Sequence, residues 1–301
     1  MRQKILVIVG PTASGKSALG VRLARKFKGE VISADSRQVY TGLDIGTGKI
    51  TKKEMKGVPH HLLDVASPKK KFSAGDFVER ARAAIKDITS RGKIPIIVGG
   101  TGFYVDSLVG RIVLPNVPPD TRLRATLTKK STAQLFALLK KRDPKRARAM
   151  DNPSERNNKI RIIRALEIAS ALGKSPKSTE NSSLYRVLWV GVRPTDAQLK
   201  KNIQNRLSAR IKSGMIREAR GLRKSGLSYK RMEELGLEYR SLSRHLRGFI
   251  SRKELERELQ SDIWRYARKQ IGYWKRNKLI KWFDPKNRAK IILHVEKSLK
   301  R

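Results

Sequence analysis

The chain has 301 residues, with 69 Lys and Arg against 26 Asp and Glu, and its formal net charge is +43 at pH 7. It contains no cysteine, which excludes a disulfide scaffold, a thiolate nucleophile and a cysteine-ligated metal centre. Its length and its 39% of hydrophobic residues exclude a chain that is disordered throughout, and they predict one large domain or two.

The first third of the chain alternates strand patterns with helix patterns. The short β-branched run Lys4–Val9 predicts a buried parallel strand, and the apolar residues of Ser14–Lys28 recur at helical spacing. A second strand is predicted over Glu30–Ser33, a helix over Phe72–Arg91 and a third strand over Ile94–Val98. This alternation predicts an α/β fold with a doubly wound parallel sheet, in which ligands bind at the carboxyl ends of the strands.

The composition becomes more polar and more helical in the middle of the chain. Three prolines lie in Leu114–Pro119, helical stretches follow over Gln134–Lys141 and Asn157–Leu172, and Gly173–Ser183 is a linker rich in Ser, Lys and Pro. We therefore expect residues 113–183 to form a helical insertion in the α/β core.

The last part of the chain returns to the core. Tyr185–Val192 predicts a further strand, and amphipathic helices are predicted over Thr195–Arg223 and Arg252–Lys278. The second of these helices places on one face Leu255, Leu259, Ile263, Tyr266, Ala267, Gln270, Ile271 and Trp274. The core is thus expected to comprise residues 1–112 and 184–301.

The excess of positive charge favours a polyanionic partner, because Lys and Arg neutralise phosphates. The alternative is a basic surface tuned for solubility. The first 110 residues hold 20 basic and 9 acidic residues and the remainder hold 49 and 17, so the excess is enriched in the later part but is not a detachable tail. No segment has the roughly 18 uncharged apolar residues of a membrane span, and we expect a soluble, cytoplasmic protein.

A phosphate-binding loop of the P-loop kind follows the first strand. The pattern GxxxxGK[ST] is matched by Gly10, Pro11, Thr12, Ala13, Ser14, Gly15, Lys16 and Ser17, with a strand before it and a helix after it. Backbone N–H groups of such a loop surround phosphate oxygens, and the helix N-terminus adds partial positive charge. Lys16 is expected to reach the terminal phosphates and the Ser17 hydroxyl to ligate Mg²⁺.

A hydrolytic NTPase needs an Asp at the end of an apolar strand, and the chain lacks it there. The strand Ile94–Val98 ends in Gly-Gly-Thr-Gly, with no Asp to hold Mg²⁺. Asp35 follows the second strand instead, and we expect it to face the phosphate loop across the carboxyl edge of the sheet. There it would accept a proton from a substrate amine or hydroxyl. The alternative roles for Asp35 are a helix cap or an indirect partner of Mg²⁺.

Five blocks of sequence together carry a resemblance to a known family. They are GPTASGKS at Gly10–Ser17, ISADSRQVY at Ile32–Tyr40, VPHHLLD at Val58–Asp64, VGGTGFY at Val98–Tyr104 and RIIRALE at Arg161–Glu167. In this order they resemble the bacterial tRNA dimethylallyltransferases, also called tRNA isopentenyltransferases, over nearly the whole chain. The resemblance implies a P-loop NTPase-like fold with an inserted helical domain.

The same resemblance implies the reaction. A dimethylallyl group would pass from its diphosphate to N6 of the adenosine 3′-adjacent to the anticodon, with Mg²⁺ as the only cofactor and a monomer as the active form. Asp35 would accept the N6 proton, and Thr101 would orient the amine and the diphosphate. The adenine has to leave its stack to reach such a site. Two other readings stay open, a P-loop kinase for a nucleoside or small metabolite and a non-catalytic RNA-binding protein with a degenerate loop.

Binding residues carry over from the family one by one. Contacts to the tRNA anticodon stem-loop are implied for Asp35, Ser36, Arg37, Gln38, Thr101, Arg124, Arg161, Arg164, Arg268, Lys269 and Gln270, and Arg206 is implied near the diphosphate. The chain departs from the family at Ile160, where a Gln is usual, and at Asn202, where an Arg is usual. The alternative for each arginine is a solvated surface charge.

Aromatic and histidine residues are open to two interpretations. Trp264, Tyr266, Tyr273 and Trp274 would stack on bases, although the place of Trp274 on the apolar face favours the core. His60 and His61 are adjacent, so their side chains diverge, and a structural role is favoured over a metal site.

Overall fold

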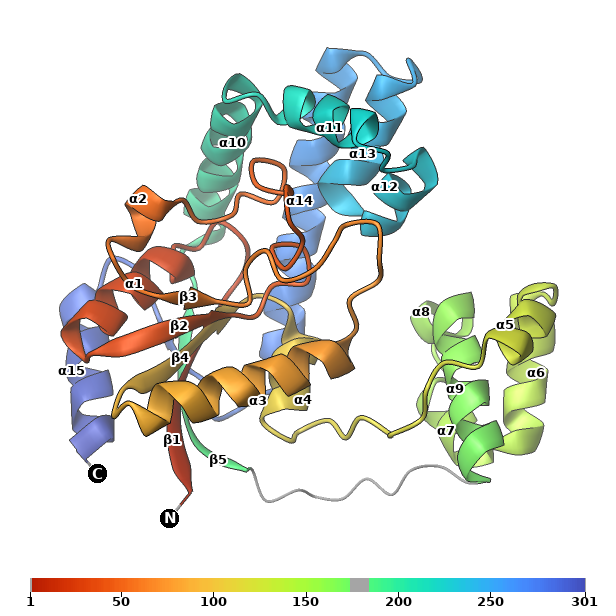
Figure 1. Ribbon diagram of the computed structural model, residues 1–301, viewed down its shortest axis with the longest axis horizontal. Coiled ribbons are helices and arrows are strands. Elements are labelled where there is room, and N and C mark those ends of the chain that lie inside the picture. Colours follow the sequence, from red (N-terminus) through yellow and green to blue (C-terminus); the bar gives the residue numbers. More distant parts are fainter. Residues whose placement is uncertain (1, 174–183, 301) are drawn as a thin grey trace. The chain divides into compact units, whose positions relative to one another are not determined.

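The computed structural model describes residues 2–173 and 184–300, and the chain divides into two compact units (Figure 1). The larger unit comprises Met1–Ile112 and Ser182–Arg301, and the smaller comprises Val113–Asn181. The linker predicted over Gly173–Ser183 lies outside the described residues, apart from Gly173. Within the described residues, no helix has the length and apolar character that a membrane crossing requires.

A six-stranded parallel sheet forms the centre of the larger unit. Its strands are β1 (Gln3–Val9), β2 (Gly29–Ser33), β3 (His60–His61), β4 (Ile94–Gly99), β5 (Tyr185–Val192) and β6 (Lys281–Phe283), in the order β3-β2-β4-β1-β5-β6. Every pairing is parallel. β4 lies between β1 and β2, so the loops that follow these three strands meet at one carboxyl edge. This confirms the predicted α/β class and identifies the edge where a ligand is expected.

Helices cover both faces of the sheet. α1 (Lys16–Lys26) and α15 (Arg288–Lys300) share a core with alternate residues of β1 and β4, whereas α3 (Ala74–Ser90) and α4 (Gly102–Leu108) pack on the other face. The indole of Trp274 is fully buried and lies 6.0 Å from that of Trp189 in β5, which confirms its predicted place in the core. A short α2 (Lys52–Met55) lies in the connection after β2.

A layer of five helices stands over the carboxyl edge of the sheet (Figure 1). It consists of α10 (Asp196–Lys212), α11 (Met215–Lys224), α12 (Tyr229–Leu235), α13 (Leu237–Leu246) and α14 (Arg252–Trp274). These helices share an apolar core with the segment after β2, to which Val39, Tyr40 and Leu43 contribute. The layer therefore forms one wall over the loops that carry the candidate site.

Two helix predictions in this layer were wrong. The helix predicted over Thr195–Arg223 is divided into α10 and α11, because Gly214 adopts φ 100°, which an α-helix does not accommodate. The helix predicted to reach Lys278 ends at Trp274, and the chain turns there as Asn277 N donates to Trp274 O (3.0 Å).

The smaller unit is a helical assembly with its own core. It contains α5 (Thr121–Thr128), α6 (Thr132–Arg142), α7 (Pro144–Ala149), α8 (Pro153–Arg156) and α9 (Lys159–Leu172). Side-chain oxygens cap each N-terminus, from Asp120, Ser131, Asp143, Asn152 and Asn158. Leu135, Leu139, Ile162 and Leu166 are almost fully buried between α6 and α9, so the unit holds together by its own apolar contacts.

Candidate functional site

The loop after β1 has the backbone conformation that phosphate binding requires. Gly15 adopts φ 88° and Ala13 φ 59°, which turn successive N–H groups toward one side of the loop. A Cβ on Gly10 would lie 2.4 Å from Val192 O, so only glycine allows this close approach to β5. Lys16 opens α1, and its Nζ donates to Pro11 O (3.1 Å) across the loop.

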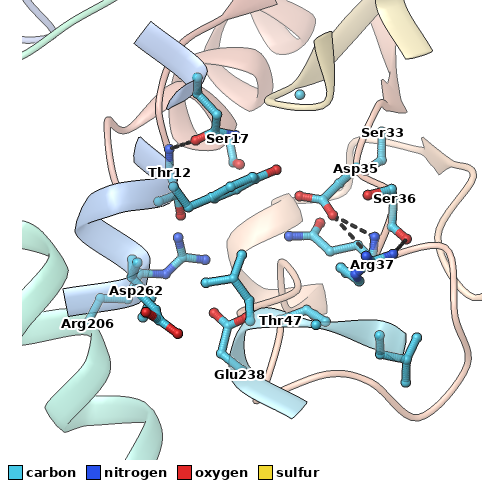
Figure 2. A pocket seen from close by; sticks show the side chains of 18 of the residues that line it. Thr12, Ser17, Ser33, Asp35, Ser36, Arg37, Thr47, Arg206, Glu238 and Asp262 are labelled. Atoms are coloured by element: carbon cyan, nitrogen blue, oxygen red, sulfur yellow. Dashed lines mark hydrogen bonds between the residues drawn. The ribbon is translucent and has the colours of Figure 1, made fainter. Parts of the chain in front are cut away.

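Asp35 lies just past β2, beside this loop. Its Oδ1 accepts the backbone N–H groups of Arg37 (2.8 Å) and Gln38 (3.3 Å), so the carboxylate is held in one orientation (Figure 2). Both bonds use the same oxygen, and no hydrogen bond from the described residues reaches Oδ2. The carboxylate therefore caps a turn through one oxygen and presents the other to the cavity.

Thr101 joins the segments after β2 and β4. Its Oγ1 accepts the N–H of Ser36 (3.1 Å), and its own N–H donates to Ala34 O (3.2 Å). Tyr266 of α14 lies near Thr101 and Asp35, and burial, followed by the negative charge of Asp35, raises the pKa of Tyr266 well above its ordinary value. The phenol stays protonated beside Asp35 and Thr101, so three polar groups converge at one point.

Two cations face Asp35 from the opposite side of the site. Burial lowers the pKa of the Lys16 ammonium to about 8, with the positive Arg206 adding to this effect and Asp35 opposing it. Burial also lowers the pKa of Arg206, with the neighbouring Arg210 contributing. Two buried cations that repel each other create a strong attraction for a polyanion placed between them.

These groups line one cavity of about 740 Å³ at the carboxyl edge of the sheet (Figure 2). The phosphate loop contributes Thr12, Lys16 and Ser17, and the segment after β2 contributes Asp35 to Gln38. Apolar walls come from β2, β4 and the α12–α13 turn, including Val31, Val98, Leu235 and Leu237. The cavity is large enough for a nucleobase together with a small phosphorylated molecule, and it offers both an apolar and a strongly cationic part.

Gln270 has a structural position that the sequence pattern did not reveal. Its side chain is buried, with Oε1 accepting the N–H of Thr12 (2.8 Å) and Nε2 donating to Gly100 O (3.1 Å). It therefore ties the phosphate loop to the glycine-rich loop after β4. A Cβ on Gly100 would lie 2.1 Å from Gln270 Nε2, which explains the glycine there.

Asn202 replaces the arginine that the family resemblance suggested. Its Nδ2 donates to Ala13 O (3.0 Å), so it braces the phosphate loop without adding charge. Arg206, one turn later on α10, lines the cavity and donates to Gly48 O (2.6 Å). Of the two positions, only Arg206 supplies a cation.

The insertion arginines have partners inside their own unit. The buried carboxylate of Glu167 accepts from Arg124 Nε (2.6 Å) and Nη2 (2.8 Å), and from Arg164 Nη1 (3.3 Å). Arg161 pairs with Glu155 and is exposed, and Ile160 beside it is 80% exposed. Arg124 and Arg164 thus stabilise the unit through Glu167, whereas Arg161 lies on its surface.

The remaining predicted contacts lie along α14. Arg268 and Lys269 are exposed, and Lys269 lies at the rim of the cavity. Tyr273 donates to Asp106 Oδ2 (2.6 Å), and Trp264 lies under Lys200 with Nζ 5.0 Å from the ring centroid. Tyr266 is therefore the aromatic side chain of this helix that faces the cavity.

The adjacent histidines point to different partners, as their spacing predicted. His60 Nδ1 lies 2.8 Å from Val58 O, and His61 Nε2 lies 2.8 Å from the buried Glu30 carboxylate. Glu30 is also bound by Arg91 and Lys93, and hydrogen bonds from these cations hold its pKa far below the ordinary value. This cluster lies outside the cavity, apart from His60, which lines it.

Sequence reasoning missed a group of cavity residues that has no recognisable motif. Thr47, Leu237 and Glu238 line the cavity, and Leu237 adopts φ 36°, an uncommon conformation for a leucine. Leu237 and Glu238 follow the tight turn at Gly236, and the glycine itself is the only sequence feature that indicates this turn. Nothing in their spacing linked them to the phosphate loop.

Known proteins resemble the chain over most of its length. Residues 38–277 match the family model described as IPP transferase. The tRNA dimethylallyltransferase of Anoxybacillus flavithermus is 38% identical over 289 residues, which cover 94% of this chain and 91% of the relative.

Solved structures of such transferases are also similar to the chain over most of its length. A tRNA isopentenylpyrophosphate transferase from Bacillus halodurans superposes with a TM-score of 0.75 at 34% identity, covering 99% of this chain and 97% of the other. A eukaryotic dimethylallyltransferase, described as acting on tRNA, has a TM-score of 0.80 at 26% identity, covering 94% of this chain and 74% of the other.

Proposed function

Since this chain belongs to the IPP transferase family, we propose that it transfers the dimethylallyl group of dimethylallyl diphosphate to N6 of the adenosine 3′-adjacent to the anticodon of tRNA. The observation that carries the proposal is the convergence of Asp35, Lys16 and Arg206 in one cavity, with Thr101 bonded to the backbone of Ser36 beside Asp35. A carboxylate for a proton and cations for a diphosphate are the two requirements of this transfer.

In the proposed reaction, N6 attacks C1 of the prenyl group and the bond from C1 to the diphosphate oxygen breaks. The proton that N6 loses passes to Asp35 Oδ2, to which no described residue donates a hydrogen bond. Lys16 and Arg206 stabilise the negative charge that develops on the departing diphosphate. Thr101 and Tyr266 orient the amine beside Asp35.

We further propose that Mg²⁺ accompanies the diphosphate. The Ser17 hydroxyl lines the cavity and offers a hard oxygen ligand of the kind that Mg²⁺ prefers. Within the described ranges, no group of three or more His, Cys, Asp or Glu forms a metal cage. A site with few protein ligands suits Mg²⁺, which keeps water molecules and phosphate oxygens as its other ligands. When bound, Mg²⁺ would neutralise charge on the diphosphate.

For the tRNA we propose contacts from the segment Asp35–Gln38, from Arg268 and Lys269 on α14, and from Arg161 on the insertion. The apolar and polar walls of the cavity suit an adenine that has flipped out of its stack. All the proposed catalytic residues come from one chain, and we propose a monomer as the active form.

A transfer assay tests the proposal. The protein is incubated with radiolabelled dimethylallyl diphosphate, Mg²⁺ and unmodified tRNA whose anticodon loop carries consecutive adenosines. We expect label in the RNA that chromatographs with N6-prenylated adenosine after nuclease digestion. An unlabelled RNA, together with turnover of ATP on small substrates, would instead establish a P-loop kinase.

The lowered pKa of Lys16 predicts how the reaction depends on pH. The protonated ammonium attracts the diphosphate, and its fraction falls as pH rises through about 8. We expect kcat/KM for dimethylallyl diphosphate to fall about tenfold between about pH 7 and about pH 9, since this ratio reports the ionisation of the free enzyme. In Lys16→Arg the fall is expected to disappear, because a guanidinium does not titrate in this range. A flat wild-type profile would contradict the assignment.

Replacing Lys269 with Ala is expected to weaken tRNA binding about three- to tenfold and to reduce the slope of log Kd against log salt by about one. The reason is the loss of one phosphate contact at the rim of the cavity. Filter binding across a salt series measures both quantities. Lys290→Ala, on α15 at the sheet face, is the matched control and should leave both unchanged. Equal losses in the two variants would show that only the background charge matters.

A further inference from the structure

The loop from Asp44 to Lys49 holds two arginines of α10 through its backbone. Gly48 O accepts a hydrogen bond from Arg206 Nη2 (2.6 Å), and Gly46 O accepts one from Arg210 Nη1 (3.0 Å). Arg210 is also paired with Glu238 (3.1 Å), whereas Arg206 makes its hydrogen bond within the described residues to the loop. The backbone of this loop therefore orients the guanidinium of Arg206, the cation proposed to bind the diphosphate.

The contact between Arg206 and the loop is close enough to depend on the backbone there. Gly48 adopts φ 60°, and a Cβ at this position would lie 2.3 Å from Arg206 Nη2. Arg206 is half-buried beside Lys16 and Arg210, so it occupies a place that charge repulsion disfavours. A small displacement of the Gly48 carbonyl would release the guanidinium toward solvent.

Glu218 of α11 holds the other side of the same loop. Its Oε2 accepts the N–H groups of Asp44 (3.0 Å) and Ile45 (2.6 Å), and its Oε1 accepts that of Gly46 (2.9 Å). Tyr239, which is buried, donates its hydroxyl to Oε1 (2.7 Å). Three consecutive backbone donors thus converge on one carboxylate, an arrangement that only an anion satisfies.

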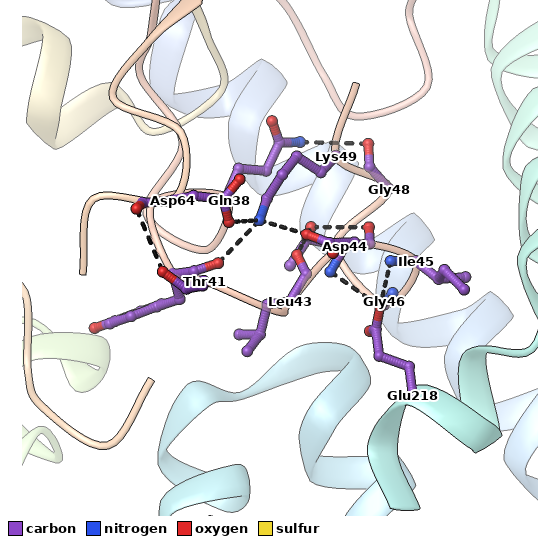
Figure 3. Close-up of polar contacts among 12 residues, drawn as sticks. Gln38, Thr41, Leu43, Asp44, Ile45, Gly46, Gly48, Lys49, Asp64 and Glu218 are labelled. Atoms are coloured by element: carbon purple, nitrogen blue, oxygen red, sulfur yellow. Dashed lines mark hydrogen bonds and ion pairs between the residues drawn. The ribbon is translucent and has the colours of Figure 1, made fainter. Parts of the chain in front are cut away.

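Lys49 stabilises the C-terminal end of the loop. Its Nζ donates to Tyr40 O (2.9 Å) and pairs with Asp44 (2.6 Å) and Asp64 (Figure 3). With Glu218 at one end and Lys49 at the other, the carbonyl groups of Gly46 and Gly48 have fixed directions.

We propose that Glu218 is a positioning residue for diphosphate binding, which acts through this loop on Arg206. The proposal rests on the proposed function, because it takes the diphosphate as the ligand of Arg206. Glu218 does not line the cavity, so it has no direct contact with substrate. Its effect is therefore confined to the diphosphate and does not extend to tRNA.

The test is Glu218→Gln, assayed for binding of inorganic pyrophosphate by calorimetry. The amide keeps the shape of the side chain, but its NH₂ group cannot accept a backbone N–H, and the loop loses part of its anchor. We expect the Kd for pyrophosphate and the KM for dimethylallyl diphosphate to rise about tenfold, as for loss of a hydrogen bond to a charged group. The Kd for tRNA is expected to stay within about twofold, which a general loss of structure would not allow.

Two further variants make the test decisive. Glu256→Gln on α14 removes a surface carboxylate that pairs with Arg252 and should leave both affinities unchanged. Tyr239→Phe removes one hydrogen bond to Glu218 and leaves every residue of the loop in place. Because Glu218 then holds the loop less firmly, we expect pyrophosphate binding to weaken about threefold. Tyr239→Phe also provides the answer if Glu218→Gln does not fold.

The outcomes separate the two proposals. If wild-type protein binds pyrophosphate and prenylates tRNA while Glu218→Gln and Tyr239→Phe match it, the positioning role is overturned and the proposed function stands. Equal losses of pyrophosphate and tRNA affinity would also overturn that role. If wild-type protein neither binds pyrophosphate nor labels tRNA, the proposed function itself fails.

Discussion

Replacing Asp35 with Asn is expected to lower kcat for prenyl transfer by about 10²- to 10⁴-fold, the usual contribution of a positioned general base. Asn keeps an oxygen that accepts the N–H groups of Arg37 and Gln38, so the turn that Asp35 caps stays intact. What is lost is the second oxygen and the negative charge that accept the N6 proton. Single-turnover kinetics with labelled dimethylallyl diphosphate measure the loss directly.

The affinity for tRNA separates this role from the alternatives for Asp35. We expect the Kd for tRNA to change less than about threefold, because Asn keeps the polar side chain and the turn at this position and the other proposed tRNA contacts are unaltered. Asp262→Asn is the matched control, since this carboxylate lines the same cavity but pairs with Arg265. If tRNA affinity falls as far as kcat, Asp35 positions the substrate and another group accepts the proton.

The second large effect is expected for Lys16→Met. This change removes the ammonium but keeps the length of the apolar stem of the side chain, and kcat/KM for dimethylallyl diphosphate should fall about 10²- to 10³-fold. Since Lys16 and Arg206 both face the diphosphate site, loss of one cation removes much of the stabilisation of the departing group. Steady-state kinetics over a range of prenyl donor concentrations measure the loss.

A control on the same helix tests whether the effect is local. Lys26→Met, at the exposed end of α1, should leave kcat/KM unchanged. Binding of pyrophosphate to Lys16→Met should weaken, whereas binding of tRNA should not. A wild-type rate in Lys16→Met would show that the phosphate loop does not hold the prenyl donor.

The net charge of +43 is larger than the proposed site needs. Only a few cations line the cavity, and Arg124 and Arg164 are bound to the buried Glu167. A protein that contacts about ten phosphates uses about ten of its basic residues. Most of the 69 Lys and Arg residues therefore lie outside the proposed site and raise the general attraction for RNA.

Local patterns in the sequence were sufficient for the elements that carry the phosphate loop. Apolar runs of β-branched residues predicted β1, β2, β4 and β5, because a buried parallel strand needs them throughout its length. β3 and β6 were missed because they have two and three residues, which is too short for any periodicity. The division between α10 and α11 was missed because the apolar spacing continues across Gly214.

The sequence by itself determined which candidate groups lie at the carboxyl edge of the sheet: the loop that carries Lys16, and Asp35 after the next strand. It did so because these groups lie within or beside short segments whose conformation local residues decide. The fold class follows from the same segments, and the family model matches the residues after them, 38–277.

Only the tertiary structure decided how that chemistry is held in place. Gln270 bonds to Gly100 across 170 residues, Arg206 to Gly48 across 158, and Glu218 to Gly46 across 172. In the sequence, nothing links each of these polar side chains to its distant backbone partner. Its role appears when folding buries it and leaves a particular backbone group as its partner, since a buried polar atom must find a hydrogen bond. Local patterns thus specify the reacting groups, and long-range packing specifies their positions.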